Sequence, residues 1–382
     1  MLYQASIPGY AGWNLETGKL FFENNNIATI PFVNIGKISS RGIEFLVGYK
    51  DHVGKLKFDI LATFTYVRSR ADDIKGDKIE RGTASRPNGY FSRTVEGEDI
   101  GEFYGFEIEK IFKPEDCDTL LINTSTNFRK ERWTPVFKAT NQPIKEIVTS
   151  VLGITEEGDT VFYTKSHLDT VYLQNNASSG DFKFVDKNGD GILNSDDYVA
   201  LGNPFAPYLY GVNINLEYGW FDLNLMWQGV YGNKIFNTRL AQLSNADGQT
   251  NWSVDYFNNY YRDAVYDTEG NLVLETREGT HPRLDPTNRN QNLASPSEYF
   301  IEDGSYLRLK SMQIGITLPS KYTEKIGLSN LRIYFGGLNL LTFTKYSGLD
   351  PEVDLRNVLE AGIDRGAYPQ PRTYTAGIKF NF

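Results

Sequence analysis

The sequence is poor in the residues from which most catalytic and metal centres are built. It contains 1 Cys, 3 His and 3 Met among 382 residues. Cys117 therefore has no partner for an internal disulfide, and no His or second Cys lies near it at metal-ligand spacing. His52, His167 and His281 lack the paired spacing of a metal site. A Gly-x-Ser-x-Gly nucleophile turn and a phosphate-binding glycine loop are also missing. These absences predict that the protein is not an enzyme.

Long apolar runs are absent as well. No stretch reaches the roughly 18 consecutive apolar residues of a transmembrane helix. A membrane-spanning strand needs only about 9–11 residues with apolar side chains at alternate positions, so a barrel in a membrane is not excluded. Residues 1–8 have neither the basic nor the apolar part of a secretion signal. Because a barrel must first cross the inner membrane, we expect its natural start to lie upstream.

Positive charge is in the minority. The sequence has 39 Lys and Arg against 48 Asp and Glu, a net charge of −9, and the acidic residues are spread along the chain. A nucleic-acid partner is therefore not expected, because such partners select basic patches. Aromatic residues, by contrast, are abundant. The 24 Tyr and 24 Phe occur together with 35 Gly, a mixture that favours strands over helices.

Several segments alternate between apolar and polar side chains for longer than ordinary globular strands do. Between residues 55 and 68, one parity carries apolar and aromatic side chains, while the other includes Lys57, Asp59 and Thr63. The preceding stretch alternates in the same way, and residues 51–54 between the two have the length of a hairpin connection. Such segments are predicted to be strands with one apolar face and one polar, water-facing face.

The same pattern recurs to the end of the chain. It predicts seven long strands, at residues 36–50, 55–68, 207–218, 221–233, 304–318, 329–341 and 372–382. The links between them alternate strictly between short and long, as in outer-membrane barrels, whose periplasmic turns are short and whose extracellular loops are long. We therefore predict an all-β fold, an antiparallel transmembrane β-barrel segment, in which residues 69–206 form a long extracellular loop.

The last predicted strand ends on aromatic side chains of one parity. Residues 377–382 follow the order Gly, two unspecified residues, aromatic, unspecified, aromatic, which resembles the signal read by the barrel-assembly machinery. Ala376 departs from the polar residue often found before that Gly. An ordinary edge strand of a soluble sandwich is the alternative, although a soluble protein with such an exposed aromatic edge would risk aggregation.

One segment has the spacing of a calcium-binding loop. Residues 186–197 fit the template D-x-[DN]-x-[DN]-G-x5-E, with Asp in place of the final Glu. Calcium takes about six to eight hard oxygen ligands, which alternate residues of a tight loop can supply. The predicted ligands are Asp186, Asn188, Asp190, the carbonyl of Ile192, and Asp197. The shorter Asp197 favours a weaker, static site, and an Asx-rich turn without metal is the alternative.

Taken together, these segments resemble one family. The loop at 186–197 is followed by Leu-Gly-Asn-Pro-Phe-Ala-Pro, Trp-Phe-Asp-Leu and Gln-Gly-Val-Tyr-Gly-Asn-Lys-Ile-Phe-Asn. Further blocks are Gly-Ser-Tyr-Leu-Arg-Leu-Lys, Leu-Asn-Leu-Leu-Thr and Tyr-Ser-Gly-Leu-Asp-Pro-Glu, at residues 304–310, 338–342 and 346–352. The whole series is similar to the hallmark stretch of SusC/RagA-type TonB-dependent outer-membrane transporters.

This resemblance implies energy-coupled import of oligosaccharides or peptides across the outer membrane of a Gram-negative bacterium. It implies a barrel of about 22 strands whose lumen is filled by a plug. The implied partners are a SusD-type surface lipoprotein, the TonB complex, outer-membrane lipid, and a glycan or peptide substrate. Seven strands cannot close such a barrel, so residues 1–382 are expected to form its C-terminal part, without the plug domain. Alone, such a piece would expose two unpaired edges and is expected not to transport.

A soluble or surface-exposed, calcium-stabilised carbohydrate-binding or adhesion β-module is the alternative function. It would use the same calcium loop and the aromatic residues of the long loops, since an aromatic ring offers an apolar face to a sugar. Packing within the loops, or contact with the lipoprotein, explains the same aromatics. These residues are Trp133, Trp252, Tyr256, Tyr260 and Tyr261, and none of them is assigned to substrate.

Overall fold

The computed structural model covers the whole chain and describes most of it. The described residues are 2–4, 13–14, 19–20, 32–34, 36–74, 78–83, 87–113, 116–123, 133–139, 149–154, 160–164, 174, 177–244, 251–266, 272–285, 290, 292–353, 355 and 357–382. No helix among them is long and apolar enough to cross a membrane.

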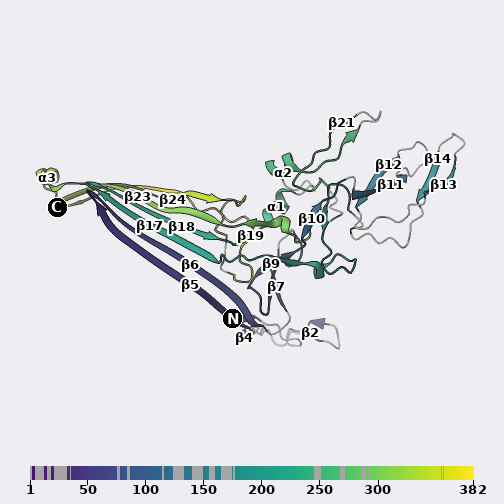
Figure 1. The fold of residues 1–382 in the computed structure, drawn as a ribbon, viewed down its shortest axis with the longest axis horizontal. Coiled ribbons are helices and arrows are strands. Elements are labelled where there is room, and N and C mark those ends of the chain that lie inside the picture. Colours follow the sequence, from purple (N-terminus) through teal and green to yellow (C-terminus); the bar gives the residue numbers. More distant parts are fainter. Residues whose placement is uncertain are drawn as a thin grey trace.

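One long antiparallel sheet dominates the structure (Figure 1). Its seven strands pair in the order β26-β24-β23-β18-β17-β6-β5. Each strand thus lies beside its nearest long neighbour in sequence, as in a meander. The bounds are β5 (Gly36–Val53), β6 (Leu56–Ile74), β17 (Tyr208–Tyr218), β18 (Phe221–Tyr231), β23 (Tyr306–Leu318), β24 (Asn330–Thr344) and β26 (Thr373–Asn381).

The seven predicted strands are all present, and the mostly antiparallel β fold is confirmed. The first hairpin differs from the prediction, because β5 continues through 51–53 and the turn is only Gly54-Lys55, with Gly54 at φ 61°. The strand β6 also runs on to Ile74, so the long link begins after residue 74 rather than at 69. Pairing with β5 along the whole length explains both extensions, since Gly36 still lies opposite Ile74.

Short and long links lie at opposite ends of the sheet (Figure 1). The turn end carries residues 54–55, 219–220 and a short link with α3 (Ser320–Thr323) and η4 (Glu324–Ile326). The other end carries three long links, and we call their described residues the loop cap.

Small elements build the loop cap. The first long link holds β7 (Lys78–Arg81), β8 (Ser92–Val95), β9 (Glu102–Gly105), β10 (Ile108–Ile111), β11 (Cys117–Asn123), β12 (Trp133–Ala139), β13 (Thr149–Ile154), β14 (Thr160–Thr164), β15 (Phe182–Phe184), η2 (Ser195–Asp197) and β16 (Val199–Gly202). The second holds β19 (Lys234–Asn237), α1 (Thr238–Leu243), α2 (Val254–Asn259), β20 (Val265–Tyr266), β21 (Leu272–Leu274), η3 (Glu298–Phe300) and β22 (Ile301–Asp303). The third holds β25 (Ile363–Asp364), and before β5 lie β1 (Leu2–Gln4), β2 (Trp13–Asn14), β3 (Lys19–Leu20) and β4 (Phe32–Asn34).

The hydrophobic core lies in the loop cap rather than on the sheet. Phe236 of β19 stacks on Phe91 at 4.1 Å between ring centroids and packs against Phe103 and Phe300. These rings and Ile363 are buried and come from all three long links. Burial of several large aromatic side chains in one cluster stabilises the association of the links.

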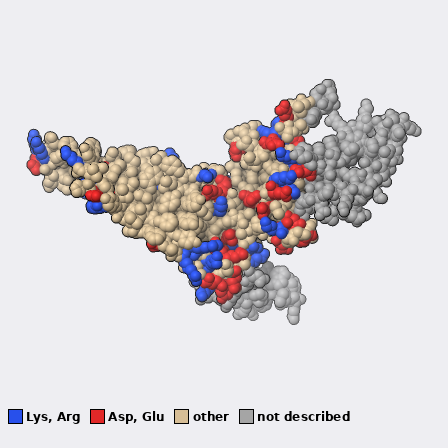
Figure 2. All heavy atoms as spheres, in the orientation of Figure 1, with Lys and Arg blue, Asp and Glu red and all other residues tan. Residues whose placement is uncertain are grey.

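The sheet, by contrast, leaves large apolar side chains exposed on one face, which we call the apolar face. Phe45 lies opposite Phe64, which lies opposite Tyr210, so that the alternating apolar residues of neighbouring strands fall in register. Phe45 is 59% exposed and Val47 is 64% exposed. Few charged side chains interrupt the middle of the sheet in the view of Figure 2. An apolar surface of this extent is abnormal for a protein in water.

The opposite face of the sheet is polar. Asp222 of β18 accepts hydrogen bonds from Arg332 of β24, with a distance of 3.1 Å from Nε to Oδ1. Lys57 and Glu217 form a second ion pair, at 3.4 Å, on neighbouring strands. The two faces therefore have opposite chemistry, as the alternation in sequence predicted.

Candidate functional site

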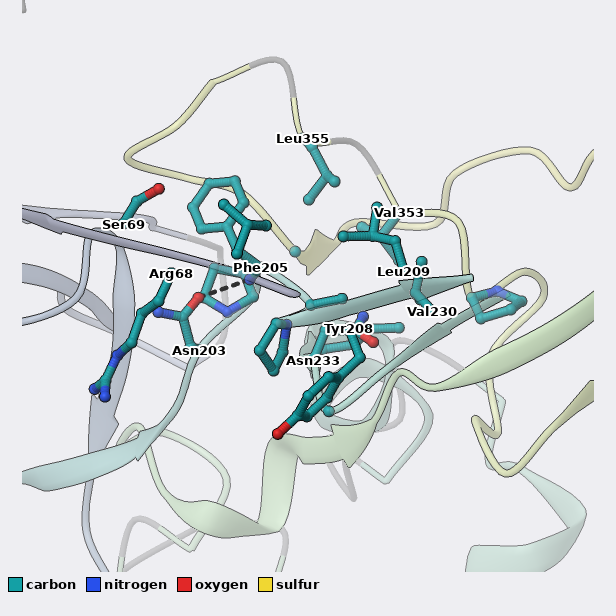
Figure 3. A pocket seen from close by; sticks show the side chains of 18 of the residues that line it. Arg68, Ser69, Asn203, Phe205, Tyr208, Leu209, Val230, Asn233, Val353 and Leu355 are labelled. Carbon is teal, nitrogen blue, oxygen red and sulfur yellow. Dashed lines mark hydrogen bonds between the residues drawn. The ribbon is translucent and has the colours of Figure 1, made fainter. Parts of the chain in front are cut away.

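A pocket of about 600 Å³ lies where the loop cap meets the sheet. Leu209 and Val230 form its wall on the sheet, and Val353 and Leu355 of the third long link lie opposite (Figure 3). The segment 203–207 enters from the first long link, where the side chain of Asn203 accepts a hydrogen bond from the backbone of Phe205 at 2.7 Å. The lining is mostly apolar with a few polar groups, as is common for ligand pockets.

Charged side chains hold the third link against the polar face of the sheet. Arg308 of β23 donates to Asp350 and to Glu352 at 2.6 Å each, and Lys310 donates to Glu352 at 2.6 Å. We call these four residues the clasp. The Arg308 side chain is 3% exposed, so its charge depends on the two carboxylates. The clasp thereby places Val353 over the pocket.

The ionised form of Asp350 is favoured within the clasp. Burial alone would raise the pKa of this carboxyl group. The hydrogen bonds from Arg308 and from the backbone N–H groups of Glu352 and Gln370 outweigh burial and hold the pKa of Asp350 below its ordinary value. The clasp is therefore an electrostatic contact that persists at neutral pH.

The segment predicted to bind calcium forms a tight, exposed loop in the first long link. Asp186 accepts hydrogen bonds from the N–H groups of Gly189 and Gly191, at 2.7 and 2.9 Å. Asp190 accepts from Ile192 at 2.8 Å. Gly191, at the Gly position of the template, has φ 80°, a conformation that favours glycine. These hydrogen bonds bend the backbone of the loop around the carboxylates of Asp186 and Asp190.

Asp197 closes the loop from its base. This carboxylate is 1% exposed and accepts hydrogen bonds from the backbone of Lys187 at 2.9 Å and of Asn194 at 3.0 Å. Among the described residues, no group of three or more His, Cys, Asp and Glu side chains is placed to hold a metal ion. The donor set of Asp186, Asn188 and Asp190 is nevertheless made of hard oxygens, the chemistry that calcium selects.

His281 has partners that the sequence did not indicate. Its Nε2 lies 2.8 Å from Oδ2 of Asp255 in α2, and its Nδ1 lies 2.7 Å from the hydroxyl of Tyr299. The hydrogen bond from His281 is the main cause of the lowered pKa of Asp255. This contact ties α2 to η3. His52 lies at the turn end of β5, and His167 lies outside the described residues.

The loop aromatics divide into packed and exposed residues. Tyr256 and Tyr261 are 1% and 3% exposed, so they pack inside the loop cap. Trp252 is partly exposed and stacks on Phe257, which is itself exposed. The side chain of Trp133 lies outside the described residues. Packing within the loops therefore accounts for the two buried tyrosines.

Sequence reasoning missed the pocket and the clasp. Both blocks that carry the clasp, 304–310 and 346–352, were singled out for their resemblance, but not for their charges. The signal was present, because one block is basic and the other acidic. Only the fold shows that the two blocks meet.

The chain has sequence relatives among TonB-dependent receptors. No model of a known protein family matches the chain. The chain is 27% identical over 369 residues to the TonB-dependent receptor P3 of Formosa agariphila. This match covers 91% of this chain and 29% of that protein. It is also 25% identical over 200 residues to the TonB-dependent receptor SusC of Bacteroides thetaiotaomicron. This match covers 52% of this chain and 17% of that protein.

Solved structures show the same fold. The RagAB peptide transporter matches with a TM-score of 0.55 and 16% identity, over 93% of this chain and 30% of that chain. The RagAB peptide importer in its open-open state matches with a TM-score of 0.57 and 16% identity, over 100% of this chain and 31% of that chain. These relatives are named as receptors or transporters rather than enzymes. The chain spans about a third or less of their lengths, and it resembles TonB-dependent receptors in sequence and part of a SusC/RagA-type barrel in fold.

Proposed function

We propose that this chain forms part of an energy-coupled importer in the outer membrane of a Gram-negative bacterium. In this proposal the barrel takes up oligosaccharides or peptides, works with a SusD-type lipoprotein that covers its outer mouth, and receives energy through TonB. Its role is transport rather than catalysis. The similarity to proteins named as TonB-dependent receptors and as a peptide transporter supports the class of function.

The observation that carries the proposal is the inverted distribution of apolar residues. The buried core lies in the loop cap, whereas the sheet exposes one continuous apolar face and pairs its charges on the other. In water such a sheet would lose the hydrophobic stabilisation that folding normally supplies. In a bilayer the same face contacts lipid, and the polar face lines an aqueous lumen.

The dimensions of the sheet fit a membrane. The strand β17, Tyr208–Tyr218, has 11 residues. At a rise of about 3.3 Å per residue and a tilt of about 40°, it spans about 25 Å along the membrane normal, the height of an outer-membrane apolar band. Tyr208 contacts Tyr66 and Tyr231 at one end, and Trp220 packs against Tyr322 at the other. Aromatic rows at both ends are typical of membrane interfaces.

The sheet is open within the described part of the chain, with β5 and β26 at its edges. We propose that further strands of the same barrel pair with these two edges, because backbone groups in lipid must find hydrogen-bond partners. The loop cap then lies on the extracellular side and the short turns lie on the periplasmic side. The chain contributes a section of the wall and its outer loops.

We also propose calcium as the ligand of the 186–197 loop. Asp186, Asn188 and Asp190 and the carbonyl of Ile192 would hold the ion, and Asp197 would complete the shell by giving up backbone hydrogen bonds. The bound ion would neutralise carboxylates that lie close together and would stiffen this loop of the cap. Its role in the proposal is structural.

Membrane fractionation and uptake test the function. The intact protein should be recovered with outer membranes and should need detergent for extraction. A strain that lacks it should lose TonB-dependent uptake of labelled oligosaccharides or of labelled peptides. The class whose uptake is lost identifies the substrate class. Recovery as a folded, detergent-free monomer in buffer would contradict the proposal and favour the soluble calcium-stabilised binding module.

A further inference from the structure

Three arginines gather on the apolar face at the loop-cap end of β5 and β6. Arg41 has the parity of Ile43, and Arg68 and Arg70 have the parity of Tyr66, so all three extend the apolar face toward the cap. We call them the arginine edge. Figure 3 shows the Arg68 and Tyr208 side chains on one side of the strands and the Ser69 and Leu355 side chains on the other. Figure 2 shows Lys and Arg side chains, with Asp and Glu side chains beside them, where the uncharged part of the sheet ends.

The register places like charges against each other. Arg41 lies directly opposite Arg68 in the antiparallel pair. Directly opposed side chains have Cβ atoms about 5 Å apart, and like charges at this distance destabilise a strand pair. Arg41 is exposed and forms no ion pair with any residue that the structure describes. Among the described residues, Asp99 is the carboxylate that forms ion pairs with this group, through Arg68 and Arg70, so the charge of Arg41 is left without an ion-pair partner.

Asp99 of the first long link orients one of these side chains. Its Oδ1 accepts a hydrogen bond from Nε of Arg68 at 2.8 Å, and Nε of Arg70 lies 4.0 Å from the same atom. The Asp99 side chain is 12% exposed, whereas Arg68 and Arg70 are about half exposed. Only Nε of Arg68 is engaged within the described residues, so its two Nη groups are available for an outside acceptor. Paired guanidinium N–H groups match the oxygens of a phosphate.

We propose that the arginine edge binds the phosphate group of a membrane lipid. The acceptor is expected to be lipid rather than a soluble anion, because the arginines continue the same face as Tyr66, Ile43 and Phe45, which are proposed to contact acyl chains. A lipid headgroup is covalently attached to those acyl chains, so it already lies at the depth of the guanidinium groups. Its binding therefore costs little further translational entropy. The anion also relieves the repulsion between Arg41 and Arg68. This inference rests on the proposed outer-membrane location.

Vesicle reconstitution of the intact protein tests the inference. The vesicles contain phosphatidylcholine alone, phosphatidylcholine with phosphatidic acid, or phosphatidylcholine with oleate at matched charge. Lipid retained after detergent extraction is counted by native mass spectrometry, and the thermal unfolding midpoint is recorded. We expect preferential retention of phosphatidic acid and a higher midpoint with it than with oleate. Arg41→Gln and Arg68→Gln should each reduce this preference about tenfold, the effect of losing a charge-assisted hydrogen bond.

The controls separate the possible failures. Lys57→Gln removes a cation from the polar face near the turn end and should leave the preference unchanged. Arg41→Gln has no described partner to disturb, so it remains informative if Arg68→Gln misfolds through loss of its contact with Asp99. Equal retention of all lipids, or equal stabilisation by inorganic phosphate in solution, would refute the lipid site. Failure of the protein to enter any vesicle would instead refute the proposed membrane location.

Discussion

The ion pair between Arg332 and Asp222 passes directly over Gly315. Arg332 lies on β24 and Asp222 on β18, and the intervening strand β23 carries Gly315 between them. A Cβ atom at Gly315 would lie 2.6 Å from both Nη2 of Arg332 and Oδ1 of Asp222. Because Gly315 has no side chain, Arg332 of β24 can donate charge-assisted hydrogen bonds to Asp222 of β18 across the intervening strand β23.

Gly315→Ala should displace this ion pair. The added methyl group forces both charged groups away, and we expect a loss of about 1–3 kcal/mol in the free energy of unfolding. Denaturant unfolding of the intact protein in detergent measures the loss. Gly48→Ala is the matched control, because its Cβ would meet only Leu61 at an ordinary 3.5 Å. Equal stability of the two variants would show that the ion pair adapts to the methyl group.

The clasp should depend on pH through Asp350. The pKa of Asp350 in the folded protein is below its ordinary value of 3.8, so its stabilisation is complete above that value and is lost as pH falls through the lower, folded pKa. Asp350→Asn should therefore destabilise the protein at neutral pH by about 3 kcal/mol or more, since Arg308 loses a buried partner. Thermal unfolding at several pH values should show the gap between wild type and variant closing in acid. A gap that is constant from neutral to strongly acidic pH would contradict this assignment.

Calcium should protect the 186–197 loop. If the proposed ion binds, adding EGTA should make this loop more sensitive to protease, and Asp186→Asn or Asp190→Asn should reduce calcium affinity at least tenfold because each removes a charged ligand. Isothermal titration with calcium measures the affinity. Asp196→Asn is the control, because Asp196 is not among the predicted ligands. An Asx-rich turn without metal would give no heat of binding in wild type and no effect of EGTA.

The loop cap should loosen when its central ring is removed. Phe236 is fully buried and contacts rings from two other segments, so Phe236→Ala should cost about 3–5 kcal/mol through the cavity it leaves. Limited proteolysis should then cut the long links faster, while the sheet retains its far-UV circular dichroism. Phe45→Ala, on the apolar face, should leave the rate of cleavage in the cap unchanged. Unchanged cleavage in Phe236→Ala would show that contacts other than those of Phe236 stabilise the loop cap.

The sequence located the strands because their signal is local. Alternation of side chains fixes which residues share a face, and the pairing of Phe45 with Phe64 keeps that alternation in register. The predicted hairpin turn was too early, since Asp51 and His52 are polar but still pair within β5 and β6. Polarity alone could not separate a turn from a strand end that projects beyond the apolar band. The loop at 186–197 was found because its ligands follow one another in sequence.

The seven strands, their two faces, the alternation of short and long links and the resemblance to TonB-dependent transporters could all be read from local sequence patterns. Which residues meet across the long links became known only from the folded chain. Arg308 and Asp350 are separated by 42 residues, and Phe91 and Phe236 come from different links, so no periodicity connects them. Local patterns encode which way a side chain points, because the strand repeats every second residue. Contacts such as the clasp depend on chain closure between distant segments, which only the folded protein establishes.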